Sequence, residues 1–133
     1  MKTEKQTIKW SEIDDLVFHL SIRIRDSGKE FDRIVAVPRG GFIPAVMLSH
    51  RLGIPIEQLD PLKPLPLYPK DIERTLIVDE ICDSGKTLRI MSKNNETATF
   101  AVLYHNIASR YDPDFAAYSG LLDKWLVFPW EQT

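Results

Sequence analysis

The chain has 133 residues, of which 44% are hydrophobic and 27% are charged, and its formal net charge is −2. These values are typical of a soluble globular domain, so we expect residues 1–133 to form a single domain. Lysine and arginine residues are scattered along the chain, and no apolar run approaches the roughly 18–20 residues of a membrane span. These features argue against nucleic-acid binding and against a membrane protein.

The first predicted elements are a helix and a strand. Apolar residues at helical spacing predict a helix that Ser11 caps and that ends near Gly28. A β-branched run at 33–37 predicts a short strand. The sequence Pro-Arg-Gly-Gly at 38–41 then interrupts this strand and predicts a turn at its carboxyl end.

The middle of the chain contains a second helix, a second strand and an irregular segment. Residues 44–52 carry apolar side chains at helical spacing, and Gly53 is the stop signal for this helix. Residues 54–59 can form another strand. Prolines recur through residues 60–70 and argue against a regular element there, because proline lacks a backbone donor and has a fixed φ.

The second half of the chain repeats the alternation of strands and helices. The most apolar short strand is predicted at 76–78, and a helix begins at 87–91. Further strands are predicted at 97–104 and 125–128. Strands that alternate with helices form βαβ units, so we expect an α/β fold with a mainly parallel twisted sheet flanked by helices.

A segment with phosphate-binding character spans residues 76–87, with the sequence LIVDEICDSGKT. Its Ser-Gly-Lys-Thr turn precedes a helix, where free N–H groups and the helix dipole favour an anion, although an ordinary capping turn has the same composition. A Walker A loop is a poor alternative, because Glu80 occupies the position of its first glycine. The adjacent carboxylates of Asp79 and Glu80 need partners, which ribose hydroxyls, Mg²⁺ or both would supply. Asp83 can cap the helix, face a base, or do both.

The pattern Asp-Glu-x-x-Asp-Ser-Gly-Lys-Thr at 79–87 resembles the signature with which type I phosphoribosyltransferases bind phosphoribosyl pyrophosphate (PRPP). It is most similar to the purine branch of that family. The resemblance implies that Asp79 and Glu80 hold the ribose hydroxyls and Mg²⁺, and that Asp83 is the acid/base group near the purine imidazole ring. It also implies that the rest of the turn binds the 5′-phosphate. These residues are Ser84, Gly85, Lys86 and Thr87.

Two further segments resemble the same family. One is the turn of Arg39, Gly40 and Gly41. It resembles the pyrophosphate loop, in which Gly-Gly lets backbone amides face the diphosphate and the arginine adds a cation. The other is 125–131, which resembles the small C-terminal hood of the xanthine-guanine enzymes and implies that Trp125 stacks on the purine while backbone groups at Leu126 read its edge. A core or interface position is the alternative for Trp125.

The chain departs from the pattern of this family at two places. Purine enzymes carry a lysine after the fourth core strand that donates to the purine 6-oxo group, whereas this chain has His105 and Asn106 there. Either residue could replace that donor, and His105 could also have no role. The mobile catalytic loop of the family corresponds to the proline-rich segment 60–70, where Lys63 or Lys70 could cover pyrophosphate or simply be solvated.

The resemblance implies a Mg²⁺-dependent enzyme that transfers phosphoribosyl from PRPP to a 6-oxopurine such as xanthine, guanine or hypoxanthine. A non-catalytic relative that senses PRPP or a nucleotide, and transfer to a non-purine acceptor, remain as alternatives. Cys82 is the one cysteine and the first residues have no apolar leader, so we expect a cytoplasmic protein in which Cys82 packs under the turn. Assembly as a homodimer or homotetramer is also expected.

Overall fold

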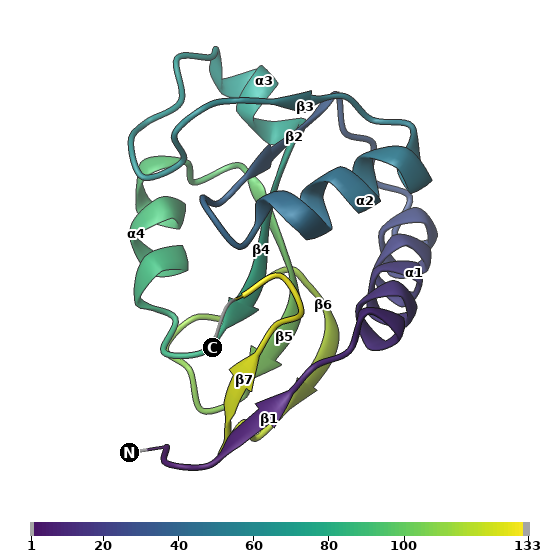
Figure 1. The fold of residues 1–133 in the computed structure, drawn as a ribbon. Coiled ribbons are helices and arrows are strands. Elements are labelled where there is room, and N and C mark those ends of the chain that lie inside the picture. The colour runs from purple at the N-terminus through teal and green to yellow at the C-terminus, as the bar shows by residue number, and fades with distance from the viewer. Residues whose placement is uncertain (1, 132–133) are drawn as a thin grey trace.

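The computed structural model describes residues 2–131 and has an α/β architecture (Figure 1). Its elements are β1 (Lys5–Thr7), α1 (Trp10–Asp26), β2 (Arg33–Ala36), α2 (Phe42–Leu52), β3 (Ile56–Glu57), α3 (Pro69–Glu73), β4 (Thr75–Cys82), α4 (Lys86–Asn94), β5 (Thr99–Asn106), β6 (Phe115–Gly120) and β7 (Trp125–Val127). The main sheet has five strands in the order β3-β2-β4-β5-β6, and every neighbouring pair is parallel. The predicted fold class is therefore confirmed.

The order of the strands reverses between β2 and β4. The chain leaves β2 through α2 to reach β3 on one side, whereas it leaves β4 through α4 to reach β5 on the other side (Figure 1). A crevice forms at the carboxyl ends of the strands at such a reversal, and open α/β sheets bind their ligands there. The turn after β2 and the turn after β4 both open into this crevice.

A second, small sheet joins the two ends of the described chain. Strands β1 and β7 are parallel, with Lys5 opposite Trp125 and Thr7 opposite Val127. In Figure 1 this pair lies beyond the carboxyl ends of β4 and β5. The predicted hood is thus made from both ends of the chain, and we call the β1–β7 pair the hood.

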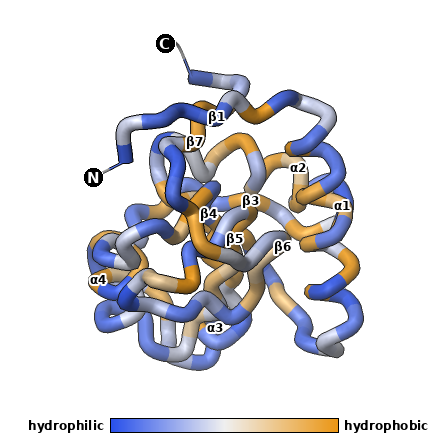
Figure 2. Tube along the Cα trace, turned by 90° about the horizontal axis from the view of Figure 1, so that it is seen from below, coloured by the Kyte–Doolittle hydropathy of each residue, from blue (hydrophilic) through white to orange (hydrophobic). Residues whose placement is uncertain are grey.

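The hydrophobic core has two layers, one on each face of the main sheet. Side chains from α1 and α2 form the layer on one face, and Leu88 and Met91 of α4 belong to the layer on the other. All eight residues of β5 are buried, as expected for a central parallel strand that is covered on both sides. In Figure 2 the hydrophobic stretches lie in the central strands, and the hydrophilic ones lie mostly on the outer segments.

Several element boundaries differ from the sequence-based expectation. The first helix begins at Trp10, and Lys9 holds the N-cap position without a side-chain cap bond, so the predicted Ser11 cap is wrong. The strand expected at 54–59 is reduced to the two residues of β3, at the edge of the sheet. Within the irregular segment, Pro69 begins the short helix α3, because a helix start does not need the missing N–H.

Strand β4 extends further than expected, β5 lies two residues later in the sequence than expected, and β1 and β6 were not predicted. Strand β4 continues through Cys82, so Asp79 and Glu80 lie inside the strand and not after it. The extension is possible because β5 pairs with β4 along its whole length, as far as Cys82 opposite His105. Strand β6 is half-buried and lacks a clear alternation of polar and apolar residues, which left no signal to predict it.

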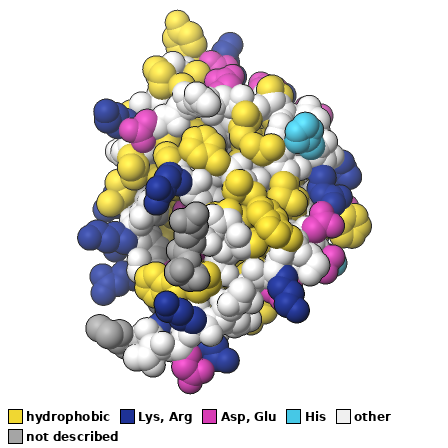
Figure 3. Space-filling view, in the orientation of Figure 1, with side chains coloured by type: hydrophobic (Ala, Val, Ile, Leu, Met, Phe, Trp, Pro, Cys, Tyr) yellow, Lys and Arg dark blue, Asp and Glu magenta, His cyan; other side chains and the backbone are white. Residues whose placement is uncertain are grey.

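The helices and the surface differ in how hydrophobic and charged side chains are distributed. In the described part of the chain, no helix is long and apolar enough to cross a membrane. On the face drawn in Figure 3, lysine and arginine side chains occupy several separate places and form no continuous block. Hydrophobic side chains gather near the middle of this face.

Candidate active site

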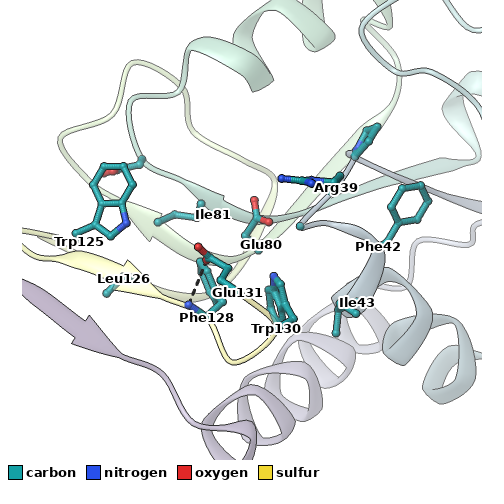
Figure 4. A pocket seen from close by; sticks show the side chains of 13 residues that line it. Arg39, Phe42, Ile43, Glu80, Ile81, Trp125, Leu126, Phe128, Trp130 and Glu131 are labelled. Atoms are coloured by element: carbon teal, nitrogen blue, oxygen red, sulfur yellow. Dashed lines mark hydrogen bonds between the residues drawn. The ribbon is translucent and has the colours of Figure 1, made fainter. Parts of the chain in front are cut away.

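A cavity of about 950 Å³ opens at the reversal point between β2 and β4 (Figure 4). Its wall is formed by the turn after β2, the first turn of α2, the end of β4 and the segment from β7 onward. Six of the residues that the sequence singled out line this cavity together: Arg39, Gly40, Glu80, Asp83, Trp125 and Leu126. Residues predicted from three separate segments therefore meet in one cavity.

The turn after β2 places one cation and one free amide in the cavity. The Arg39 side chain extends toward Glu80 in Figure 4. The Gly41 N–H donates to the Val37 carbonyl at 2.9 Å, so it is used inside the turn, whereas the Gly40 N–H forms no hydrogen bond within residues 2–131. A methyl group on Gly40 would overlap the Glu80 carboxylate. Of the two glycine amides expected to face a diphosphate, the amide of Gly40 is the available one.

The acidic pair at the end of β4 combines one buried and one accessible carboxylate. Asp79 is 6% exposed, and its Oδ1 accepts the backbone N–H of Glu80 at 2.8 Å. Burial, together with the neighbouring Glu80 carboxylate, raises the pKa of Asp79 well above its usual value. Ionising both carboxylates is therefore costly until a cation or hydroxyl donors approach them.

The donor set of this pair fits a cation that arrives together with a diphosphate. Among residues 2–131 there is no group of three or more His, Cys, Asp or Glu side chains that could hold a metal ion. Mg²⁺ usually keeps several waters and takes one or two carboxylates together with substrate phosphates. Glu80 supplies one such carboxylate at the cavity wall, whereas Asp79 is next to it in β4 but is 6% exposed and does not line the cavity.

The turn after β4 leaves the start of α4 without a side-chain cap. Gly85 holds the N-cap position in the left-handed region, with φ of 81°. The Ser84 carbonyl accepts the Arg110 N–H at 3.0 Å, and the Ser84 hydroxyl accepts the Lys86 N–H at 3.3 Å. The remaining N–H groups at the helix start can bind an oxyanion. Ser84 and Lys86 line a separate hollow of about 670 Å³ beside the α4 surface, and Thr87 is exposed on the first turn of α4.

Asp83 points away from the helix that it could have capped. The Lys2 ammonium lies 2.6 Å from both Asp83 carboxylate oxygens, and the Asn106 amide donates to Oδ1 at 2.9 Å. Burial raises the pKa of Asp83, but the Asn106 hydrogen bond and the Lys2 ion pair outweigh it and bring this pKa below its usual value. Asp83 is therefore a carboxylate at neutral pH and can accept a proton.

The hood contributes aromatic side chains to the cavity. Trp125 is 56% exposed at the cavity wall, which rules out a core position. Leu126 is buried next to it. Phe128 and Trp130 stack with ring centroids 4.9 Å apart and an interplanar angle of 9°, and both line the cavity.

His105 and Asn106 end β5, and neither lines the cavity. Asn106 uses both ends of its amide, because Nδ2 donates to Asp83 and Oδ1 accepts the Ala108 N–H at 3.0 Å. The Nδ1 atom of His105 lies 3.3 Å from the Ser119 hydroxyl. Protein partners therefore hold both side chains, and base recognition by either residue stays a prediction.

The proline-rich segment is fixed against the C-terminal end of α4. The Leu65 N–H donates to Asn95 Oδ1 at 3.0 Å, and Asn95 Nδ2 donates to the Pro61 carbonyl at 3.2 Å. This end of α4 is opposite the turn at Gly85. Lys63 and Lys70, which lie on or next to this segment, do not line the cavity.

Several residues of the site were not predicted as site residues from the sequence. Phe42 and Trp130 line the cavity, and Lys2 binds Asp83. Phe128 and Trp130 follow Trp125 at short intervals in the sequence, and this run of aromatic residues could have indicated Trp130 as a site residue. Nothing in the local sequence pointed to Lys2, because its position depends on the pairing of β1 with β7 at the other end of the chain.

Comparisons with known proteins agree with this architecture, although no family model matches the chain. The chain is 30% identical to the xanthine-guanine phosphoribosyltransferase of Gluconobacter oxydans over 141 residues, covering 94% of this chain and 83% of that protein. The crystal structure of a purine phosphoribosyltransferase from Pyrococcus horikoshii is 29% identical with a TM-score of 0.77, covering 98% of this chain and 97% of the other.

A more distant structure shows the same fold. The xanthine-guanine-hypoxanthine phosphoribosyltransferase of Helicobacter pylori has a TM-score of 0.74 at 20% identity, covering 96% of this chain and 94% of the other. The fold of this chain is thus that of a type I phosphoribosyltransferase. Within that class, the chain belongs to the purine phosphoribosyltransferase family.

Proposed function

We propose that this protein transfers the phosphoribosyl group of PRPP to a 6-oxopurine base, giving a nucleoside 5′-monophosphate and pyrophosphate. The observation that carries the proposal is the single cavity in which Arg39, Glu80, Asp83 and Trp125 meet. The name of the Gluconobacter oxydans relative supports xanthine and guanine as the bases to test first. The test measures PRPP-dependent release of pyrophosphate with a panel of purine and pyrimidine bases. If no base in the panel supports release, the proposal is refuted.

In the proposed reaction, the bond between C1′ and the pyrophosphate oxygen breaks, and a bond between C1′ and N9 of the base forms. Pyrophosphate leaves with the bonding electrons, and the proton on N7 of the base moves to the Asp83 carboxylate. Arg39 and the Gly40 N–H stabilise the negative charge that develops on the leaving pyrophosphate. The turn at Gly85 holds the 5′-phosphate, so that C1′ lies between the base and the leaving group.

We also propose that the reaction depends on Mg²⁺. Asp79 and Glu80 would hold the ion together with the ribose hydroxyls, and the bound ion would supply charge neutralisation for the diphosphate. Support comes from the Glu80 carboxylate at the cavity wall, directly next to Asp79 in β4.

Replacing Glu80 with alanine should weaken binding of PRPP with Mg²⁺. A ligand present at about a hundred times its Kd adds about 2.7 kcal/mol to the free energy of unfolding, which appears as a rise in Tm. We expect most of this rise to disappear in Glu80→Ala, measured by thermal melting with and without PRPP and Mg²⁺. Glu73→Ala, at an exposed position on α3, is the matched control and should keep the full shift. An unchanged shift in Glu80→Ala would remove the acidic pair from the PRPP site.

Replacing Trp125 with alanine should weaken base binding and leave PRPP binding nearly intact. Stacking of a base on an aromatic face contributes roughly 1–3 kcal/mol, so we expect the KM for the base to rise by about one to two orders of magnitude. Trp125→Phe keeps an aromatic face and should recover most of the loss. Because Trp125 is 56% exposed, the Tm should change little. A joint loss of Tm and of affinity for both substrates would instead identify an interface residue.

We propose a cytoplasmic homodimer or homotetramer. Large hydrophobic side chains are exposed on α1 and α2, including Phe18 at 45% and Val46 at 44%, and these support contact with another copy of the chain. Sedimentation velocity on the purified protein measures the state, and a monomer at micromolar concentration would contradict the proposal.

A further inference from the structure

The hollow of about 670 Å³ beside α4 lies on the opposite side of the main sheet from α1 and α2 (Figure 1). It is lined by Ser84, Lys86, Arg89, Ile90, Lys93 and Arg110. None of these residues lines the cavity at the strand reversal. The hollow therefore has four cationic side chains and no acidic one, although the chain as a whole has a net charge of −2.

The four cations of this hollow have no protein partner in the part of the chain that the structure describes. None of them forms an ion pair there. All four are exposed, and Ile90 beside them is 44% exposed. The hollow thus presents an open surface with four positive charges that no described carboxylate balances.

The placement of these cations is unfavourable for α4 itself. Lys86 and Arg89 are within the first four residues of α4, where the positive end of the helix dipole favours acidic side chains, and the first turn has none. Arg89 is three residues from Lys86 and four from Lys93, and like charges repel at these spacings on a helix. An anion in the hollow removes both unfavourable interactions. Breaches of a local rule that nothing inside the protein compensates are expected at functional sites.

The spacing of the cations fits an elongated anion. Lys86 and Lys93 are two helical turns apart, which is about 10 Å along the axis of α4. Arg89 lies between them on the same face, and Arg110 approaches from the segment after β5. A single phosphate group contacts only part of this row, whereas a linear chain of phosphate groups extends along it. Arginine binds phosphate oxygens through its planar fork, and lysine adds a point charge.

We propose that the hollow beside α4 binds an anion with a linear chain of three or more phosphate groups, either an inorganic oligophosphate or the triphosphate of a nucleotide. Its volume is within the range of about 300–1,000 Å³ that is usual for small-ligand sites. The site is separate from the cavity of the proposed function, because Arg89, Lys93 and Arg110 lie outside that cavity. The inference goes beyond the proposed function and does not depend on which base the protein uses.

The test is isothermal titration with sodium tripolyphosphate in the absence of Mg²⁺, with pyrophosphate and phosphate as shorter chains. We expect the affinity to rise with each added phosphate group. Arg89→Gln and Lys93→Gln, combined in one variant that we call the α4 variant, should weaken tripolyphosphate binding by roughly 10- to 100-fold, through the loss of two charge-assisted contacts. The Tm of the α4 variant should equal or exceed that of the wild type, because repulsion along α4 is relieved.

A parallel titration with ATP distinguishes the two sources of the phosphate chain. Binding at least as tight as that of tripolyphosphate identifies a nucleotide as the ligand, because the nucleoside then adds contacts to the hollow. Weaker binding of ATP identifies an inorganic oligophosphate. If the wild type binds neither compound, the inference is overturned.

The matched control combines Arg23→Gln with Lys29→Gln, which removes one arginine and one lysine at exposed positions without an ion pair among residues 2–131. It should bind tripolyphosphate as the wild type does. Arg39→Gln alters the other cavity and should keep the binding event that the α4 variant loses.

Three results would overturn the inference: an equal loss of affinity in the control, a lower Tm in the α4 variant, or binding that is lost in Arg39→Gln and kept in the α4 variant. The last result would place the anion in the cavity at the strand reversal. A wild type that binds tripolyphosphate in the hollow but releases pyrophosphate with no base overturns the proposed function alone.

Discussion

Asp83→Asn should lower turnover by about 10²- to 10⁴-fold, the usual contribution of a positioned acid/base group. Asparagine keeps the size of the side chain and can still accept one hydrogen bond from Asn106 or Lys2, but it cannot take the N7 proton of the base. The affinity for PRPP should change little, because Arg39 and the turns that bind phosphate are unaltered. Steady-state kinetics and isothermal titration with PRPP measure the two quantities separately.

Asp123→Asn is the matched control for this prediction. Asp123 is an exposed aspartate before β7 that forms no ion pair in the described residues, so its replacement should leave kcat unchanged. Wild-type turnover in Asp83→Asn would exclude Asp83 as the proton acceptor. Loss of PRPP binding in the same variant would show that Asp83 acts mainly in holding the ribose or the metal ion.

Gly85→Ala should damage both stability and PRPP binding. Gly85 has φ of 81°, where a side chain costs about 1–2 kcal/mol. An added Cβ atom would also lie 2.8 Å from the Tyr111 nitrogen and 3.0 Å from the Arg110 nitrogen. Relieving this contact costs roughly a further 1–3 kcal/mol and shifts the turn to which the proposed function assigns the 5′-phosphate.

Gly28→Ala separates the two causes. Gly28 has a similar φ of 74°, but nothing lies within 4 Å of an added Cβ atom. It should show the backbone cost alone in chemical denaturation, with PRPP affinity unchanged. Equal losses of stability in the two variants would mean that the contact with the 110–111 segment does not hold the phosphate-binding turn in place.

The residues next to the reversal of the strand order were the predictable part of the site. The turn with Arg39 and the strand with Asp79 and Glu80 each combine an apolar run with a local change of composition, and local patterns of this kind determine where a strand ends and a turn begins. The parallel sheet followed from the alternation of elements. Its consequence is that both turns share one edge of the sheet, which predicted that Arg39 and Glu80 lie close together.

The surroundings of Asp83 were less predictable, because they depend on contacts between distant parts of the chain. His105 and Asn106 occupy the expected place in the sequence, but Asn106 is engaged by Asp83 and Ala108. Lys2 reaches Asp83 through the pairing of β1 with β7, and a strand of three exposed residues has no pattern that reveals its partner. Residue type and spacing describe one segment at a time, whereas this contact joins segments from opposite ends of the sequence.

The pairing of β1 with β7 also determines which part of the protein opens most easily. These strands have three residues each, and closing their contact encloses almost the whole chain, while β4, β5 and β6 pair over longer stretches. Amide hydrogen exchange should therefore be fastest in the hood and slow in β4 and β5. A bound base that touches the hood should slow exchange there selectively, so occupancy of the base site and local unfolding of the two chain ends are thermodynamically linked.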